Sequence, residues 1–420
     1  MTSKEILRNA LDHKEGKVAV DFGGTGVTGI HCSVVEGLRE YYGLEKKPVF
    51  VHDPYQMLGY IDEDLRQALG TDVMPILGRY DFFGMRYDGN PKEWKTPWGQ
   101  TVLVADNFEV TEDKDGKVYF YAEGDTSYPP SGVMPKGGYF VDATPRQTWD
   151  IDDENLNVED NLEEYNVLSD DTVAFFKKIA PQYKDSTYGL ATETNATGLG
   201  DVSGIPGTSL KNPKGIRDVT AWYMALIENE DYIEEMFDRQ TDIALENLKL
   251  YYEIFGDSID VIKICGNDFG TQISTFCSPE KFRRLYKPYY LKMNDWVHSN
   301  TNWKVFKHSC GAIEPLIGEL YEAGFDIINP VQWTATGMDP VKIKEKYGKD
   351  VTFWGGGINT QKTLPFGTPE EVREEALRHL EIFSKGGGYV FNTIHNLQAK
   401  VPVENVVALV NAVKEFNGDR

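Results

Sequence analysis

The sequence is poor in cysteine and has no long apolar segment. Four cysteines, Cys32, Cys265, Cys277 and Cys310, are spread over 420 residues, which is too few for a disulfide framework in so long a chain. We therefore expect a reducing, cytoplasmic environment. No apolar run approaches the roughly 18 residues that a membrane-spanning helix needs, and the N-terminal segment lacks the apolar core of a signal peptide. These absences argue against a membrane as a partner.

Positive charge is also scarce. The chain has 43 lysines and arginines against 66 aspartates and glutamates, a formal net charge of −23. Such an acidic chain is a poor match for the phosphates of nucleic acid. The apolar and charged fractions, 40% and 26%, are those of a soluble globular protein. A chain of this length can bury a large core as one large domain or as two to three ordinary ones.

Short apolar runs alternate with helix-like segments along most of the chain. Good helix starts, such as Ser278 before Pro279 and Thr368 before Pro369, separate several of the runs. Repeated strand–helix units predict either an eight-stranded (β/α) barrel or a doubly wound open sheet. We favour the barrel because the units follow one another without a break in composition. The predicted strands are Lys17–Phe22, Tyr188–Glu193, Val261–Cys265, Trp303–Lys307, Asp326–Asn329, Val351–Trp354 and Tyr389–Asn392.

One region interrupts this texture. From about residue 81 to residue 150, apolar and polar residues alternate and are joined by turns such as Asp115–Gly116, a pattern typical of antiparallel strands. We interpret the chain, residues 1–420, as a single (β/α) barrel domain with an antiparallel β insertion at 81–150. Trp94 and Trp98 of the insertion either cover the barrel mouth or pack within its own hairpins.

A histidine and a cysteine stand two positions apart in "WKVFKHSCGAIEPLI", residues 303–317. Taken alone the pair is weak evidence, because buried free cysteine is common and behaves as a small hydrophobic residue. Its position is more informative, since the chemistry of (β/α) barrels occurs where strands end and loops begin. His308 and Cys310 follow a predicted strand directly. An imidazole and a thiolate together suit zinc.

A catalytic zinc needs about three protein ligands and one open position, so a third ligand should follow another strand. The late segment "GGGYVFNTIHNLQAKVP" places His395 in such a position, and we predict a zinc site of His308, Cys310 and His395. Cys265 ends a further strand and Asp268 follows it; these two are the alternatives at this edge, as groups that support the ligands or contact the substrate. One thiolate and two neutral imidazoles would leave the site with net positive charge.

Other polar residues at predicted strand ends are candidates for substrate contacts. We expect Asp268 and Glu193 to act as catalytic groups that handle protons. We expect amide side chains at other strand ends to bind a small polar substrate. These are Asn329, Gln332, Asn392 and Gln398.

Three segments carry a resemblance to a known family. "FKHSCGAIEPLIGELYEAGFDIINPVQ", "FWGGGINTQKTLPFGTPEEVREEA" and "GGGYVFNTIHNLQAKVPVENVVALVNAVKEF" resemble the uroporphyrinogen decarboxylase-like superfamily, and most of all its cobalamin-dependent methyltransferase branch. The resemblance is continuous from about Val261 to Phe416 and weaker before it. It implies a (β/α) barrel, in agreement with the strand–helix pattern.

The resemblance also implies a function. In the methyltransferase branch an H-x-C motif and a cysteine near the C-terminus hold zinc, so His308 and Cys310 match the motif and His395 stands where the cysteine is expected. The implied activity is zinc-dependent methyl transfer between a small methylated ether, amine or thiol and a corrinoid, within one-carbon metabolism. The corrinoid would arrive on a partner protein, since the chain has no cobalamin-binding module of its own. Relatives are often dimers, which is compatible with a homodimer here.

Two other functions are compatible with the sequence. One is metal-independent decarboxylation of a small carboxylate, with His395 and Asp268 handling protons. The substrate would not be uroporphyrinogen, because the arginine-rich substrate motif of that enzyme is absent and the loops 23–29, 193–206 and 266–272 contain no arginine. The other is a non-catalytic binding protein that has kept the barrel. The intact His308–Cys310 pair argues against the latter.

Overall fold

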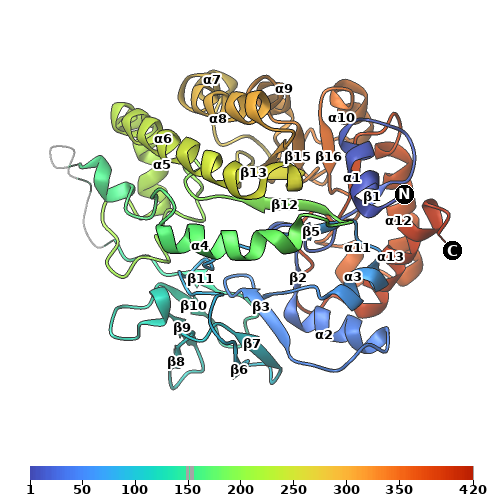
Figure 1. The fold of residues 1–420 in the computed structure, drawn as a ribbon, viewed down its shortest axis with the longest axis horizontal. Helices are drawn as coiled ribbons and strands as arrows, with labels where there is room; N and C mark the ends of the chain where they lie inside the picture. The colour runs from blue at the N-terminus through green and yellow to red at the C-terminus, as the bar shows by residue number, and fades with distance from the viewer. Residues whose placement is uncertain (148–150, 152–155, 420) are drawn as a thin grey trace.

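The computed structural model describes residues 1–147, 151 and 156–419. A parallel sheet of eight strands forms the centre, and helices surround it (Figure 1). Among the described residues no helix is both long enough and apolar enough to cross a membrane. The order of the strands in the sheet is β1 (Ala19–Val20), β17 (Tyr389–Phe391), β16 (Thr352–Trp354), β15 (Ile327–Asn329), β14 (Lys304–His308), β13 (Val261–Cys265), β12 (Gly189–Glu193) and β5 (Val73–Pro75).

The two end strands, β1 and β5, meet through Asp72, which makes the sheet a nearly closed (β/α) barrel as predicted. The Asp72 amide donates to the Val20 carbonyl at 2.6 Å, and the Val20 amide donates to Asp72 Oδ2 at 2.9 Å. Thr71 adds a hydroxyl that accepts from the Phe22 amide at 3.0 Å. The strands predicted from sequence are all present: β13 has the predicted bounds, β14 is shifted by one residue, and the others are shorter than predicted. β5 was not predicted, because three residues are too few to show a period.

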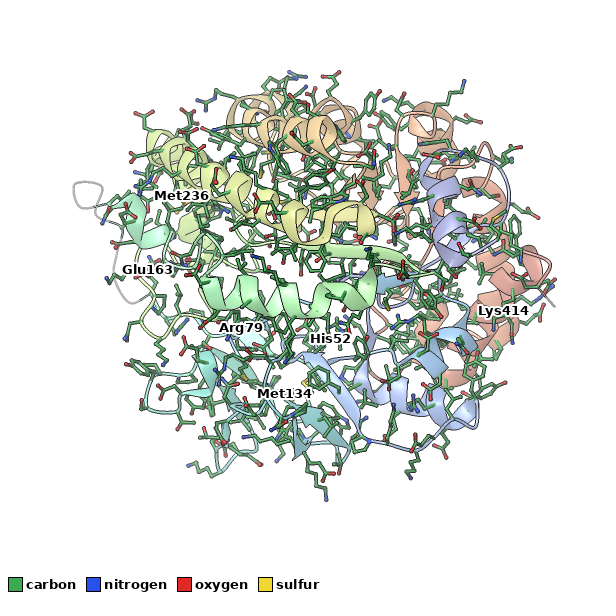
Figure 2. The ribbon with its side chains drawn as sticks, viewed as in Figure 1. His52, Arg79, Met134, Glu163, Met236 and Lys414 are labelled. Atoms are coloured by element: carbon green, nitrogen blue, oxygen red, sulfur yellow. The ribbon has the colours of Figure 1, made fainter. Side chains whose placement is uncertain are left out.

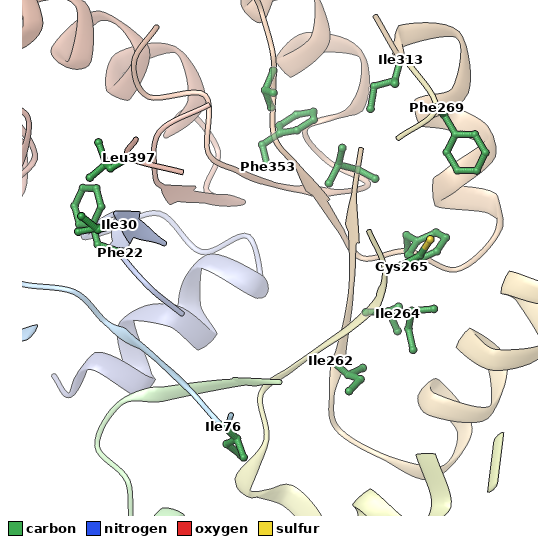
Figure 3. Packing of buried hydrophobic residues seen from close by; sticks show 14 of the residues in the cluster. Phe22, Ile30, Ile76, Ile262, Ile264, Cys265, Phe269, Ile313, Phe353 and Leu397 are labelled. Carbon is green, nitrogen blue, oxygen red and sulfur yellow. The ribbon is translucent and has the colours of Figure 1, made fainter. Parts of the chain in front are cut away.

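Side chains on alternate residues of the strands form two cores. Residues pointing into the barrel, such as Val261, Phe306 and Trp354, pack with Leu7 and Leu11 of α1. Residues pointing outward, such as Ile262 and Ile264 of β13, pack against the helices (Figure 3). Because α1 lies at the amino ends of the strands, the barrel is plugged there, and only the carboxyl ends remain available for a site.

The helices follow the strands as the sequence pattern indicates. Both predicted caps are present: Ser278 accepts from the Lys281 amide, and Thr368 forms a capping box with Glu371. The helices are α1 (Ser3–Leu11), α2 (Cys32–Tyr41), α3 (Glu63–Leu69), α4 (Asp170–Ile179), α5 (Val219–Glu228), α6 (Glu230–Phe255), α7 (Pro279–Leu285), α8 (Lys287–Asn300), α9 (Glu314–Glu322), α10 (Pro340–Tyr347), α11 (Thr363–Phe366), α12 (Pro369–Phe383) and α13 (Val403–Phe416).

The antiparallel strands between β5 and β12 form two small sheets on one side of the barrel (Figure 1). One sheet joins them to earlier parts of the chain, because β7 pairs in parallel with β3. The first sheet contains β2 (Ile30–His31), β4 (Leu58–Gly59), β3 (Val49–Asp53), β7 (Thr101–Val104) and β6 (Lys92–Lys95). The second contains β11 (Asp142–Ala143), β10 (Gly132–Met134), β9 (Val118–Phe120) and β8 (Val110–Glu112).

The predicted insertion therefore has the expected antiparallel strands, although it is anchored on β3. Its predicted end at residue 150 lies outside the described residues. Both tryptophans pack locally: the Trp94 ring lies 5.0 Å from that of Phe108, and the Trp98 ring lies 5.0 Å from that of Tyr139. The interpretation that they pack within the β region is the one the structure supports.

Removal of the Asp72 side chain tests the closure of the barrel. Asp72→Ala leaves the buried Val20 amide without an acceptor, and we expect a loss of about 1–3 kcal/mol in the free energy of unfolding. Asp72→Asn keeps an acceptor oxygen and should lose less. Urea unfolding of both variants at neutral pH measures the difference. An unchanged midpoint for Asp72→Ala would show that this contact does not hold β1 and β5 together.

Candidate active site

Two loops after neighbouring strands come together at the carboxyl end of the barrel. The loop after β13 contains Gly270, and the loop after β14 contains Gly311 at φ +91°. A Cβ atom on Gly311 would lie 2.3 Å from the Gly270 carbonyl carbon, so no side chain fits there. The positive φ angle of Gly311 also favours glycine. The contact lets the Cys310 amide donate to Asp268 Oδ1 at 2.6 Å.

This contact assembles a compact set of ligand atoms from Asp268, His308 and Cys310, here called the donor group. One ligand atom from each residue lies within 4.8 Å of the others. Cys310 Sγ is 3.5 Å and Asp268 Oδ1 is 3.6 Å from His308 Nε2. A carboxylate oxygen, an imidazole nitrogen and a sulfur at these separations are a donor set that zinc accepts.

The His308 ring is oriented by Asn329 at the end of β15. Asn329 Nδ2 donates to the Trp354 carbonyl at 2.8 Å, which leaves Asn329 Oδ1 to accept from His308 Nδ1 at 2.6 Å. The proton is therefore on Nδ1, and the lone pair of Nε2 faces the other two donors. Burial lowers the pKa of His308 to about 3, so the ring is neutral. Metal-binding histidines are usually held in this way.

Burial sets the protonation of the other two donors. It raises the pKa of the Cys310 thiol well above the ordinary value, with the Asp268 charge as the second cause. It also raises the pKa of Asp268, which the Cys310 amide and Lys307 oppose. A divalent cation reverses such shifts and deprotonates a thiol that binds it. The donor group therefore fits a metal ion better than it fits any arrangement of protons.

Lys307 was missed by the sequence analysis. Its side chain is fully buried, and Nζ donates to the carbonyls of Asn267 (2.6 Å) and His308 and lies 4.9 Å from the centre of the Phe269 ring. A strand residue that precedes a ligand normally faces the other side, and nothing in the sequence distinguishes this lysine from a surface one. Its positive charge favours the ionised form of Asp268.

His395 lies beside the donor group rather than within it. Its ring centre is 6.4 Å from that of His308, and Asp268 takes the third place in the compact set. Burial lowers the pKa of His395, and its Nδ1 is buried without a hydrogen-bond partner among the described residues. An unpartnered buried nitrogen beside a donor set is consistent with a fourth ligand or with a substrate contact. His395 as a zinc ligand stays a prediction.

Cys265, the other alternative, is turned away from the donor group. A bulge between Lys263 and Cys265 shifts the register of β13, and such bulges re-aim the following side chains. Cys265 Sγ lies 3.0 Å from the Tyr290 hydroxyl in the outer core. Its thiol is therefore part of the packing between the sheet and α8.

The amide residues predicted to bind substrate are mostly committed to the protein itself. Gln332 Oε1 accepts from the Gly311 amide at 2.7 Å, and buried Asn392 donates to the Asp21 carbonyl. Together with Asn329, they hold the loops in place. Gln398 is exposed and lines a separate small cavity with His31 and Tyr55. Their predicted substrate contacts remain predictions.

A cavity of about 310 Å³ opens at the carboxyl ends of β1, β5 and β12. We call it the acidic cavity, since Asp53, Asp81 and Glu193 line it with a single cation, Lys263. Glu193 pairs with Lys263. The acidic cavity and the donor group are both built in part on β13, because Lys263 of this strand lines the cavity and Asp268 follows the strand. Of these acidic residues the sequence singled out Glu193 alone: β3, which ends at Asp53, was not among the predicted strands, and β5, which precedes Asp81, has only three residues.

Comparison with known proteins identifies the family. The model of the uroporphyrinogen decarboxylase (URO-D) family matches residues 208–416. The chain belongs to the uroporphyrinogen decarboxylase-like superfamily. A solved structure of a methyltransferase from Methanosarcina mazei has the same fold, with a TM-score of 0.55, 19% identity and 99% of both chains covered.

Curated relatives in this superfamily match over limited segments. The uroporphyrinogen decarboxylase of Psychromonas ingrahamii is 34% identical over 96 residues, 23% of this chain and 25% of that protein. The enzyme of Ruthia magnifica is 22% identical over 196 residues, 46% of this chain and 52% of that protein. The matched segments thus span about a quarter to about half of these relatives.

Asn329 offers a test of the donor group. Asn329→Leu removes the acceptor for His308 Nδ1, and we expect metal affinity to fall by about 10–100-fold, as for other such partners. Asn329→Asp keeps an acceptor and should retain most of the affinity. Competition with a chromogenic zinc chelator measures both. Equal affinity in the wild type and Asn329→Leu would show that the Nδ1 contact does not orient a ligand.

Proposed function

We propose that this protein is a metal-dependent methyltransferase, with zinc held by Asp268, His308 and Cys310. The observation that carries the proposal is the donor group, in which a buried imidazole and a partly buried thiol and carboxylate converge at the carboxyl end of the barrel. A fold shared with a protein named as a methyltransferase is in agreement with it. The thiol beside an oriented, unprotonated imidazole nitrogen supports a metal site over metal-free decarboxylation.

The bound metal and the residues that hold it have different roles in the proposed reaction. When bound, zinc supplies Lewis acidity that stabilises a departing oxygen, nitrogen or sulfur, or a substrate thiol as thiolate. His308 offers a neutral nitrogen, while Cys310 and Asp268 together offer two negative charges. With Asp268 as third donor, the charge of a divalent ion is balanced, whereas the His395 set predicted from sequence would leave it positive. A balanced site accepts a neutral leaving group as readily as an anionic one.

His395 is placed to handle a proton or contact the substrate. Its ring lies beside the donor group. Burial lowers the pKa of the ring, which keeps it neutral, and the charge of Asp268 opposes this shift. A neutral imidazole can give or take a proton as a leaving group departs. Glu193, the other residue predicted to handle protons, pairs with Lys263 at the acidic cavity, and its catalytic role stays a prediction.

We extend the proposal to a corrinoid as the methyl acceptor, carried on a partner protein. The acidic cavity is at the low end of the range of about 300–1,000 Å³ for small-molecule sites. A corrin macrocycle would therefore have to approach from outside the mouth. This partner follows from the resemblance of the sequence to the methyltransferase branch.

Decarboxylation is the second candidate, and the matches to uroporphyrinogen decarboxylases favour it. The acidic cavity argues against uroporphyrinogen as its substrate. A molecule with many carboxylates needs cationic anchors, and the single lysine that lines the cavity is already paired with Glu193. A small monocarboxylate would meet the same repulsion from Asp53 and Asp81.

Metal content and methyl transfer test the proposal together. We expect about one zinc per chain in the wild type, and its loss together with activity in His308→Ala and Cys310→Ser. Cys277→Ser, which changes a half-buried thiol elsewhere, is the matched control and should keep both. Elemental analysis gives the metal, and formation of methylcobalamin from free cob(I)alamin and a panel of methylated amines, ethers and thioethers gives the activity.

The remaining variants separate the alternatives. Asp268→Ala should lose zinc and His395→Ala should retain it while transferring methyl groups more slowly. The opposite pattern would make His395 the third ligand. Release of carbon dioxide from a small carboxylate by a metal-free wild type would overturn the proposal in favour of decarboxylation.

A further inference from the structure

Two carboxylates in the acidic cavity have no cationic partner. Asp53 accepts from the amides of Tyr55 and Gln56 and from the Gln56 side chain. Asp81 accepts from the amides of Phe83 and Met85. Neither forms an ion pair with any described residue. Carboxylates withdrawn from water in this way are unfavourable unless a positive charge joins them.

The rest of the ionisable lining does not supply that charge. Lys263 is paired with Glu193, and burial lowers the pKa of His52 to about 4, so this imidazole is neutral at physiological pH. When Asp53 and Asp81 are ionised, the lining therefore has an excess of negative charge. A cationic ligand would balance it.

Aromatic side chains form a wall of the same cavity. Tyr80, Phe82 and Tyr87 line it, and here they are called the aromatic wall. The Phe82 ring packs 4.5 Å from that of Tyr55, and the Tyr87 hydroxyl donates to the His52 carbonyl on β3. Aromatic rings attract methylated ammonium groups in particular, because the positive charge is spread over apolar methyl surface.

His52 is an independent sign of a ligand. Its side chain is 9% exposed and lines the cavity, yet its ring nitrogens have no hydrogen-bond partner among the described residues. Figure 2 shows it where the barrel meets the antiparallel strands. Its ring nitrogens are therefore free to form a hydrogen bond with a ligand in the cavity. A hydroxyl or carboxylate on the ligand would satisfy this imidazole.

We infer that the acidic cavity binds a methylated ammonium compound, between the two unpaired carboxylates and the aromatic wall, as the methyl donor. The inference rests on the proposed methyl transfer and names the class of its substrate. The volume of about 310 Å³ suits a molecule of this size. The nearby donor group shares β13 with the cavity.

The reaction is balanced without a further reactant. The C–N bond breaks with its electron pair on nitrogen, and the methyl carbon forms a bond to the cobalt(I) of the corrinoid. The ammonium compound becomes a neutral tertiary amine, and the corrinoid gains the methyl group.

Binding of a matched pair of probes tests the inference directly. Choline and its neutral carbon isostere 3,3-dimethylbutan-1-ol have the same shape, and calorimetry measures the affinity of each. We expect choline to bind at least about tenfold more tightly than the isostere, a difference typical of cation recognition by rings and carboxylates. Equal affinities, or binding of neither, would overturn the inference.

Variants locate the binding. Asp81→Asn and Phe82→Leu should each weaken choline binding by about tenfold or more. Asp142→Asn, which changes a carboxylate in the neighbouring small cavity, is the matched control and should bind as the wild type does. Weakening by Asp81→Asn but not by Phe82→Leu, together with displacement of choline by potassium or magnesium, would assign the carboxylates to an inorganic cation instead.

The pH dependence gives a second readout. Burial, with the charge of Asp53, raises the pKa of Asp81 to about 7. Protonation below that pH removes a charge that attracts the cation, so choline binding should weaken as the pH falls from 8 to 6. The other groups that face Asp81 are Asp53, Tyr87, Glu193 and Lys263. Asp81→Asn should flatten this dependence, and a profile unchanged in the variant would contradict the assignment.

Failure of this inference can be told from failure of the proposed function. The acidic cavity does not include the donor group, so His308→Ala should lose zinc and still bind choline. Zinc without choline binding in the wild type would reject the cationic substrate alone. Choline binding without zinc would reject the metal-dependent reaction alone.

Discussion

The contact between the loops after β13 and β14 is the constraint on which the site depends. It exists because Gly270 and Gly311 have no side chains, and a Cβ atom at either would meet backbone atoms of the other loop at less than 3 Å. Asp268 and Cys310 come within hydrogen-bond distance only because these backbones touch. The barrel supplies rigid strand ends, but the glycines convert two neighbouring strand ends into one set of ligand atoms.

The mouth of the barrel is divided between two kinds of electrostatics. On the side of β13 and β14, the donor group lies beside Lys307 and the neutral ring of His395. On the side of β1, β5 and β12, the unpaired carboxylates of the acidic cavity create a negative field. In water-poor surroundings both fields are strong. One half therefore suits a metal ion and the other an organic cation, with β13 between them.

The antiparallel strands explain why the acidic cavity exists at all. β3 contributes His52 and Asp53, and the segment after β5 contributes Asp81 and the aromatic wall. The pairing of β7 with β3 fixes this layer against the barrel. The barrel frame is shared with a superfamily, whereas the residues that line the cavity are those that a bound small molecule would contact.

The sequence by itself determined the strand–helix repeat, the antiparallel region and the His308–Cys310 pair, because periodicity, caps and motif spacing are local properties. It also placed Asp268 and His395 at strand ends. Only the tertiary structure brings Asp268 into the compact set of ligand atoms with His308 and Cys310, through the contact of two glycines that are far apart in sequence. The bulge that turns Cys265 outward, the closure of the barrel through Asp72 and the meeting of Asp53 with Asp81 are likewise long-range. Such features depend on the distances between segments that fold together, and no window of sequence contains them.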